Sequence, residues 1–325
     1  MAIQIVTRSK DLPKLCEGNF FHSRDLFVML EQTPRVMPCM VIATNEKGEV
    51  LGQILAQVRT KRRFFFINFT HRARIYGEGS YYKGIEFKEK NELFEAMLTA
   101  LVHFLKRRFC YHIELSDTSK KMFGYRALRK NGFVPIPWIQ LHHSLHSKAP
   151  KERANEKVLH RVQRAYDNGF ITREAVGEQE IHQLYTLVKK YYILRKQRHI
   201  PAEKLFQQIG ASQYGHVYVT TYKDKIVGGS VVVESGRESM LWFDAALDKR
   251  YLFYHPHYVT VWHALQDAFE RGQDHIHILN LGLPFSHSPY RDFMLSFGGK
   301  QVSSYRWFRF SNSLIRSLMY WYYRL

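Results

Sequence analysis

The sequence contains little cysteine, few acidic residues and no long apolar run. Its three cysteines, Cys16, Cys39 and Cys110, are widely spaced and form no CxxC pair. That spacing argues against a disulfide framework and is typical of a reducing compartment. No apolar run approaches the roughly 20 residues that a membrane-spanning helix requires. The opening residues, MAIQIVTRSK, lack the apolar stretch of a signal peptide. We therefore expect a cytoplasmic protein.

Familiar catalytic signatures are also missing. The sequence has no P-loop, no Rossmann glycine motif, no G-x-S-x-G motif, and no cysteine near a histidine in the setting of a nucleophile. Histidine is common, with 17 residues, and several lie close together: His142, His143 and His146, then His255 and His257, then His275 and His277. None of these groups stands with carboxylates in a recognisable metal-binding motif. We therefore expect no metal site.

Positive charge is abundant. The chain has 48 Lys and Arg against 29 Asp and Glu, a formal net charge of +19 and a pI of about 9.8. Such a field attracts nucleic acid, phosphorylated ligands or an acidic membrane surface, and the simpler alternative is a charge that serves only solubility. The basic residues occur in separate clusters along the chain. This dispersal favours clusters at several edges of one surface over a single nucleic-acid-binding tail. The clusters are 59–63, 106–108, 189–190 and 195–198.

The most informative feature that is present is an order of elements that occurs twice. The first copy has strands over 40–69, a loop, a long helix over 89–109, a strand over 112–115, a helix that ends at Gly132, and a strand over 134–141. The second has strands over 216–246, a loop, a helix, a strand over 275–281, a helix that begins near Tyr290, and a strand over 300–308. A repeat of this length predicts two similar domains, whose joint is a natural place for a substrate cleft.

These patterns predict a mixed α+β fold, with mostly antiparallel sheets and flanking helices, in two tandem domains, 1–148 and 149–325. A polar linker with Pro150 separates the copies, and helices over 152–168 and 179–197 precede the second sheet. With 325 residues and 45% hydrophobic content, the chain is long enough for two cores. The long helix of the first copy places its apolar residues on one face at the helical period: Phe94, Leu98, Leu101, Val102 and Leu105.

The last segment, 312–325, predicts an amphipathic helix. Its apolar stripe contains Leu314, Ile315, Leu318, Trp321, Tyr322 and Leu325, whereas Arg316 and Arg324 fall off the stripe. A helix rich in Trp, Tyr and Arg suits a membrane interface. The alternative is that it docks on its own protein.

A glycine-containing loop follows the first sheet. Arg74, Gly77 and Gly79 fit the pattern R-x-x-G-x-G. Glycines at such positions let backbone N–H groups approach a phosphate, and a following helix N-terminus favours negative charge. Several residues separate this loop from the helix, so the alternative is a loop whose glycines only shape the turn.

The second copy has no such glycine loop. In its place, residues 249–258 interleave basic and aromatic side chains, among them Arg250 and His255, which suit a polar ligand with rings or phosphates. Trp242 and Asp244 end the preceding strand and are placed to line the same cleft. Asp244 is a candidate to accept a proton or to orient an amine nucleophile, and the alternative is a turn or cap residue.

A second set of candidates follows the strand over 275–281. Asn280 ends that strand, Ser286 lies in the next loop, and Tyr290 and Arg291 open the following helix. Small-molecule sites form where strands end and helices begin in α/β sheets. We therefore expect these side chains near the same ligand.

The order of elements resembles the GNAT acyltransferase fold, and its doubling resembles the FemABX group of tandem-GNAT aminoacyltransferases. The resemblance covers nearly the whole chain and rests on order and spacing. The segments that carry it are 18–23 (GNFFHS), 76–77 (YG), 161–169 (RVQRAYDNG), 242–246 with 254–256 (WFDAA, YHP) and 293–299 (FMLSFGG). Met294 stands where the group's F-K-x-x-F-G segment has lysine, so that lysine's role cannot be carried over, and the coiled-coil arm of some members is absent.

The resemblance implies transfer of an activated acyl group to an amine. FemABX members take an amino acid from aminoacyl-tRNA and attach it to a peptidoglycan precursor, and other tandem-GNAT proteins use acyl-CoA. We therefore expect a cytoplasmic N-acyl- or aminoacyltransferase with acyl-CoA or aminoacyl-tRNA as donor, no metal, and a small molecule or cell-envelope precursor as acceptor.

In this hypothesis Asp244 is the first choice for the catalytic group, and the second domain is the favoured location. Arg74, Gly77 and Gly79, or the basic rim near Arg250 and Arg291, are the candidates to bind phosphates. Partners include tRNA and, by peripheral contact, the inner face of the membrane, whereas the oligomeric state stays open. The alternative function is a non-catalytic tandem-GNAT module that binds RNA or an anionic membrane surface.

Overall fold

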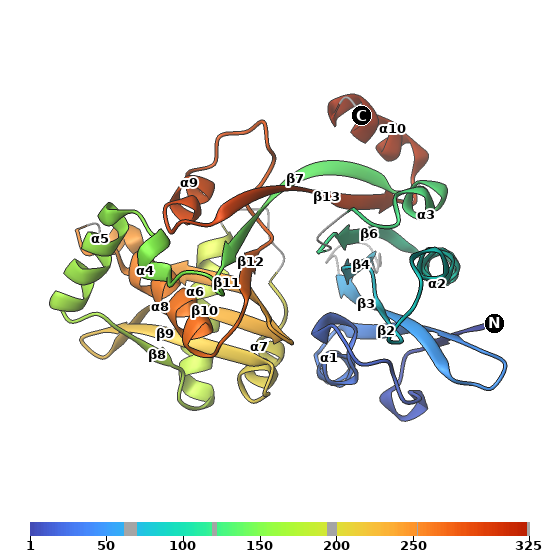
Figure 1. Ribbon diagram of the computed structural model, residues 1–325, viewed down its shortest axis with the longest axis horizontal. Helices are drawn as coiled ribbons and strands as arrows, with labels where there is room; N and C mark the ends of the chain where they lie inside the picture. The colour runs from blue at the N-terminus through green and yellow to red at the C-terminus, as the bar shows by residue number, and fades with distance from the viewer. Residues whose placement is uncertain (62–69, 119–121, 194–199, 252, 324–325) are drawn as a thin grey trace. The chain divides into compact units, whose positions relative to one another are not determined.

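The computed structural model describes residues 1–61, 70–118, 122–193, 200–251 and 253–323 (Figure 1). Its contacts divide the chain into two compact units. Unit 1 consists of Met1–Trp138 together with Ser304–Leu325, and unit 2 consists of Ile139–Ser303. Two long strands are therefore divided between units: β7 (Val134–Ser144) begins in unit 1 and ends in unit 2, and β13 (Lys300–Phe310) does the reverse.

Unit 1 is a sheet with helices on it. The strand order is β1 (Ala2–Val6), β2 (Val36–Thr44), β3 (Val50–Lys61), β4 (Thr70–Tyr76), β6 (Cys110–Ser116) and the C-terminal part of β13, and β5 (Ser80–Tyr81) pairs with β3. Only β4 and β6 are parallel neighbours among these pairs. The helices are α1 (Arg24–Glu31), α2 (Phe87–Arg107), α3 (Tyr125–Lys130) and α10 (Ser313–Tyr323), with short turns η1 (Ser9–Asp11) and η2 (Phe20–His22).

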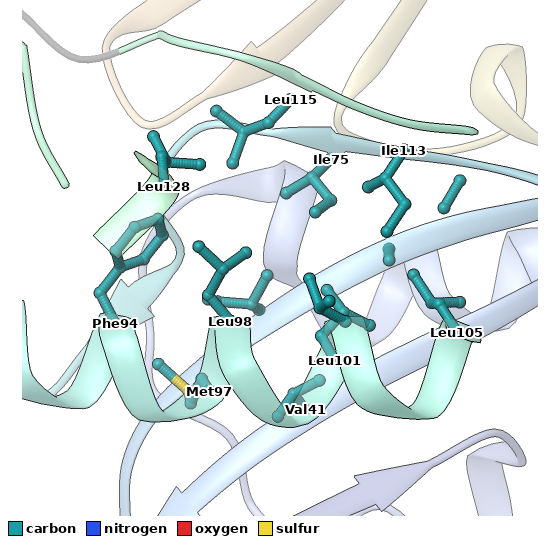
Figure 2. Close-up of a cluster of buried hydrophobic side chains, with 14 of the residues drawn as sticks. Val41, Ile75, Phe94, Met97, Leu98, Leu101, Leu105, Ile113, Leu115 and Leu128 are labelled. Atoms are coloured by element: carbon teal, nitrogen blue, oxygen red, sulfur yellow. The ribbon is translucent and has the colours of Figure 1, made fainter. Parts of the chain in front are cut away.

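The core of unit 1 forms between α2 and one face of the sheet. Because apolar residues recur along α2 at the helical period, one side of the helix is buried, as predicted. Figure 2 shows Phe94, Leu98, Leu101 and Leu105 pointing toward Ile75 of β4 and toward side chains of β6. Fully burying each such side chain contributes about 1.5–3 kcal/mol relative to leaving it exposed. Burial of this cluster therefore stabilises the unit.

Unit 2 repeats the arrangement with helices on both faces. The strand order is β7, β12 (His275–Ile278), β11 (Glu238–Ala246), β10 (Lys225–Ser235), β9 (Gly215–Tyr222) and β8 (Ile171–Glu174). The helices are α4 (Pro150–Arg153), α5 (Glu156–Asp167), α6 (Gly177–Ile193), α7 (Glu203–Gly210), α8 (Pro256–Glu270) and α9 (Pro289–Leu295), with one short turn, η3 (Asp248–Arg250).

Neighbouring residues of β9 show how the two faces are covered. Tyr218 donates to Asp267 of α8, whereas a Cβ on Gly210 of α7 would touch Val217. Successive side chains of a strand point to opposite faces, so α8 and α7 lie on opposite sides of the sheet. Figure 1 shows α5 beside α8, in agreement with their contacts. The site described below lies on the α8 face.

The predicted fold class is confirmed: both units have mostly antiparallel sheets with flanking helices. Some elements differ. The predicted helix over 152–168 is two helices, because Ala154 is extended (ψ 145°) and Asn155 then caps α5. The strand over 275–281 ends earlier, at Ile278, and β1, β8 and α7 have no counterpart in the prediction.

The compact units also differ from the division at 148/149. Residues 139–148 lie with unit 2 and Ser304–Leu325 with unit 1, because the end of β7 pairs with β12 and the end of β13 pairs with β6. Parts of the prediction fall outside the described residues: the strand end at 62–69, residues 62–63 of the basic cluster 59–63, the basic cluster 195–198, the helix end at 194–197, and residues 324–325.

Candidate active site

Two parallel strands of unit 2 separate where the candidate site begins. β11 pairs with β12 through Glu238–His275, Ser239–Ile276 and Met240–His277. β12 then ends at Ile278, but β11 continues to Ala246. The carboxyl half of β11 therefore extends beyond its ladder with β12. In α/β sheets this is the end at which ligands bind.

A β-bulge lies in β11 at the same point. Against β10, Leu241 opposes Val232 and Phe243 opposes Val231, so Trp242 is the extra residue of the bulge. A bulge bends its strand and changes the direction of the side chains that follow. Beyond it, Phe243 contacts Phe206 of α7, and the next residue, Asp244, faces α8 and α9.

Asp244 is almost fully buried, with 1% of its surface exposed. Its Oδ2 accepts a hydrogen bond from Nε2 of His257 at 2.7 Å, and its Oδ1 accepts one from the hydroxyl of Tyr290 at 2.6 Å. The hydroxyl of Tyr192 donates to the Asp244 carbonyl oxygen at 3.0 Å. Burial of a carboxylate is costly unless it is paired and hydrogen-bonded, and these contacts meet that requirement.

His257 joins Asp244 to a second carboxylate. Its Nδ1 lies 3.2 Å from Oδ2 of Asp248, and its ring is stacked on Phe293 with centroids 4.5 Å apart. Burial favours the neutral imidazole, but the hydrogen bonds and charges of Asp244 and Asp248 outweigh it and raise the pKa of His257 to about 9. At neutral pH the centre is therefore an imidazolium between two carboxylates.

Tyr290 is the outer member of this group. Ser288 caps α9 by accepting from the Arg291 N–H at 3.3 Å, and Pro289 occupies the first turn, so the start of the helix is well defined. Tyr290 is partly exposed, whereas Asp244 and His257 are buried. Of the three, Tyr290 therefore has the most surface open to solvent.

The other predicted residues of unit 2 lie at the ends of the elements that carry Asp244, His257 and Tyr290 or next to them. Arg250 ends η3 and is exposed, and Asn280 lies just beyond β12 and is partly buried. His255 precedes α8 in the left-handed region, with φ 53°. Burial, with the nearby arginines Arg161 and Arg164, lowers the pKa of His255.

Arg291 and Ser286 hold a loop together. The Arg291 guanidinium donates to the carbonyl oxygens of Leu283 at 2.9 Å and of Ser286 at 2.7 Å, and the Ser286 hydroxyl donates to Leu283 at 3.2 Å. These bonds fix the segment between β12 and α9. Binding of a substrate phosphate by Arg291 stays a prediction.

Arg74, Gly77 and Gly79 lie in unit 1. The Arg74 guanidinium is 3.4 Å from Oε1 of Glu114, and the Gly77 N–H donates to the Ser116 carbonyl at 2.8 Å. A Cβ at Gly77 would lie 2.5 Å from a Thr118 oxygen, and one at Gly79 would lie 2.7 Å from the Gln53 carbonyl. These contacts favour the alternative interpretation, a loop shaped for its turn, and phosphate binding there stays a prediction.

Sequence reasoning missed His257, Asp248 and Tyr192. The signal for His257 was present: a buried aspartate at the end of an apolar strand requires a partner. The segment that follows that strand offers His255 and His257, and of these two only His257 is buried. The choice between them needs the start of α8, which Pro256 fixes.

The described residues contain no group of three or more His, Cys, Asp or Glu placed to hold a metal ion. Within the same part of the chain, no helix is both long and apolar enough to cross a membrane.

Residues 156–290 match the family model for the acetyltransferase (GNAT) domain. The match lies within unit 2 and includes Asp244, His257 and Tyr290. Unit 2 resembles a GNAT domain in sequence as well as in fold. A search of curated proteins returned no match to the sequence.

Solved structures share the fold of the whole chain. The crystal structure of FemX has a TM-score of 0.62 at 10% identity and covers 98% of this chain and 99% of its own. The C-terminal domain of a putative lysylphosphatidylglycerol synthetase from Agrobacterium fabrum has a TM-score of 0.57 at 11% identity, with 93% and 90% covered. A tandem GNAT protein from the clavulanic acid biosynthesis pathway has a TM-score of 0.57 at 8% identity, with 96% and 99% covered. The predicted tandem GNAT-like fold is confirmed.

Proposed function

We propose that this chain transfers an acyl or aminoacyl group to an acceptor amine at the carboxyl end of β11. The observation that carries the proposal is the buried Asp244 carboxylate, held by His257 and Tyr290 beyond the point where β11 and β12 separate. The match of residues 156–290 to the GNAT domain model and the tandem-GNAT fold support acyl transfer as the reaction class.

In the proposed reaction the amine nitrogen attacks the carbonyl carbon of the donor. A new C–N bond forms, the bond to the leaving group breaks, and one proton moves from the nitrogen to the leaving oxygen or sulfur. The Tyr290 hydroxyl donates a hydrogen bond to Asp244. As its oxygen accepts the amine proton, its own proton passes to the Asp244 carboxylate, and the proton returns when the leaving group is protonated. Asp244 is then a positioning residue for Tyr290, because its own carboxylate is buried.

The imidazolium of His257 keeps Asp244 ionised before the reaction. A positive charge at 2.7 Å favours the carboxylate over the carboxylic acid. A carboxylate that is ionised at this stage accepts from Tyr290, so the phenol keeps one orientation. The cluster therefore supplies preorganisation rather than a strong base.

Among donors, the geometry favours aminoacyl-tRNA over acyl-CoA. GNAT-type binding of a pyrophosphate would use N–H groups at the start of α8, but Pro256 has none and the His257 N–H donates to the Asp248 carboxylate at 3.2 Å. An acidic side chain at this position opposes a phosphate, so the residues present do not fit CoA there.

A basic face on α5 fits an RNA backbone instead. Lys157, Arg161 and Arg164 recur at helical spacing and are exposed. Arg161 stacks over the Tyr258 ring of α8 at 4.9 Å, which places this face beside the start of that helix. Contacts of Lys and Arg with phosphates supply most of the affinity of such surfaces.

For the acceptor we propose an amine of a cell-envelope precursor, and for the location the cytoplasm. The support is the fold shared with FemX and with a putative lysylphosphatidylglycerol synthetase domain. The shared fold supports both proposals but does not itself specify the acceptor or the location.

The test uses the purified full-length chain. Transfer is measured from tRNA charged with labelled amino acids, and in parallel from a panel of acyl-CoA thioesters, to peptidoglycan-precursor amines and to simple amines. We expect label to move from aminoacyl-tRNA only. Transfer from acyl-CoA alone would reverse the donor assignment. No transfer from either donor, with RNA or vesicle binding retained, would favour the non-catalytic binding module.

A further inference from the structure

The C-terminal helix leaves large apolar side chains uncovered. In α10 the exposed fractions are 72% for Leu314, 42% for Ile315, 62% for Leu318, 78% for Trp321 and 70% for Tyr322. These residues form the single stripe predicted from the sequence, so docking of this stripe on the rest of the chain is not what the structure shows. Soluble monomers rarely expose a contiguous apolar patch of this kind without a partner.

We propose that α10 lies in the headgroup region of an anionic phospholipid bilayer, with this stripe toward the acyl chains. The charge of the segment selects this partner. Residues 312–325 contain no Asp or Glu, whereas they contain two basic residues, Arg316 and Arg324. Anionic lipid attracts such a segment at about 1 kcal/mol for each basic residue near the surface.

The composition and length of α10 fit the interface rather than the bilayer core. Trp321 and Tyr322 are of the types that concentrate at the membrane–water boundary. The helix has 11 residues, about half of the roughly 20 needed to span a bilayer. Helices with apolar, aromatic and basic residues arranged in this way lie in the plane of the interface.

Charge also argues against a second copy of the chain as the partner. Two copies of this segment carry the same sign and repel each other, whereas the lipid surface carries the opposite sign. The proposal does not rest on transfer activity, because binding to a bilayer is measured directly.

The experiment measures binding of the full chain to vesicles. Flotation is compared for phosphatidylcholine vesicles and for vesicles of equal parts phosphatidylcholine and phosphatidylglycerol. We expect binding to the anionic vesicles only, weakened by NaCl. The double variant Leu318→Ser, Trp321→Ser should lower the partition coefficient at least about tenfold, since two apolar anchors are lost. Val176→Ser is the matched control, because Val176 is 72% exposed in unit 2, and it should bind as the wild type does.

A second measurement locates the contact. Trp321→Phe should keep vesicle binding and lose most of the blue shift of tryptophan emission. Equal binding by the wild type and the double variant, or no binding to anionic vesicles, would overturn the proposal. So would a dimer seen by analytical ultracentrifugation that the double variant abolishes, because α10 would then contact a second chain.

Discussion

The two units contain the same pair of parallel strands in two different states. In unit 1, β4 and β6 pair along their whole length, from His71–Cys110 to Tyr76–Ser116. In unit 2, β11 and β12 pair only as far as Met240–His277. The backbone ladder thus closes one pair and leaves the other open. The same fold therefore holds this strand pair closed in unit 1 and open in unit 2, where the candidate site lies.

The residues that follow the strands reinforce the difference. In unit 1 the ladder is extended by one more bond, from Gly77 to the Ser116 carbonyl. In unit 2 the bulge at Trp242 and the carboxylate of Asp244 occupy the corresponding end of the sheet. A duplicated fold does not require a duplicated site, because function depends on what the strand ends hold.

Two buried histidines, His22 in unit 1 and His257 in unit 2, are in opposite protonation states. His22 of unit 1 is fully buried and its Nδ1 accepts from the Leu55 N–H at 3.0 Å. Burial lowers the pKa of His22 to about 4, although the Tyr76 backbone opposes this. His257 has its pKa raised to about 9 by its carboxylates. His22 is thus a neutral imidazole and His257 a charged one, whereas burial also lowers the pKa of His143, a second buried histidine of unit 2.

The largest expected effect concerns the tyrosines that open the last helix of each unit. We expect Tyr290→Phe to lower kcat/KM for transfer about a thousandfold, since it removes the hydroxyl proposed to accept the amine proton. Tyr125→Phe is the matched control, because Tyr125 is 46% exposed and packs edge-on against Trp307. Steady-state rates check this. Equal losses in both variants would erase the functional contrast between the units.

The second effect is a loss of stability in alkali. His257 has a folded pKa above its unfolded value of about 6.5, so its contribution is complete below pH 6.5 and is lost as pH rises through 9. The change is on the order of 3 kcal/mol. Urea unfolding of the wild type and of His257→Gln between pH 6 and pH 10 checks it. A stability difference between the two proteins that does not change with pH would contradict a charged His257.

Unit 1 should show a similar change with the opposite sign. His22 has a folded pKa near 4, so its contribution is present above its unfolded pKa and is lost as pH falls from about 6.5 to 4. The free energy of unfolding should fall by roughly 3 kcal/mol across this range. The same urea series on His22→Gln, run in acid, measures it. An acid transition that is unchanged in the variant would assign the loss to other groups.

The smallest effect compares two glycines in the left-handed region. Gly77→Ala should destabilise unit 1 by about 2–3 kcal/mol, because backbone strain is joined by a contact with Thr118. Gly282→Ala should cost only about 1 kcal/mol, since a Cβ there meets nothing within 4 Å. Native-state hydrogen exchange in each unit measures both. Equal costs would mean that the two loops are packed alike.

The sequence was sufficient for the parts of the fold that depend on periodicity. The helical spacing of Phe94, Leu98 and Leu105 predicted α2 and its buried face, and the repeat predicted the second unit. It was not sufficient for α7 or β8, which are short, or for the end of β12. The length of β12 depends on the point at which its pairing with β11 ends. That point is set by the neighbouring strand rather than by residues 275–281 themselves.

The candidate site was predictable only in part. Asp244 and Tyr290 were both chosen, one from a strand end and the other from a helix start. In the structure the Tyr290 hydroxyl oxygen lies 2.6 Å from Oδ1 of Asp244. Their partner His257 was not chosen, because the choice depends on α8 beginning at Pro256, which puts His257 inside the helix and His255 before it. Whether Asp244 takes part in catalysis stays a prediction.

The division of β13 between the two units has a consequence for the order in which they can fold during synthesis. Unit 2 is a continuous stretch, Ile139–Ser303, and is complete as soon as that stretch has left the ribosome. Unit 1 needs Arg306–Phe310 to pair with β6, and those residues are translated after the whole of unit 2. The half of the molecule that is synthesised first is thus the half that finishes folding last, and a nascent chain must carry it with an open sheet edge until β13 has been translated.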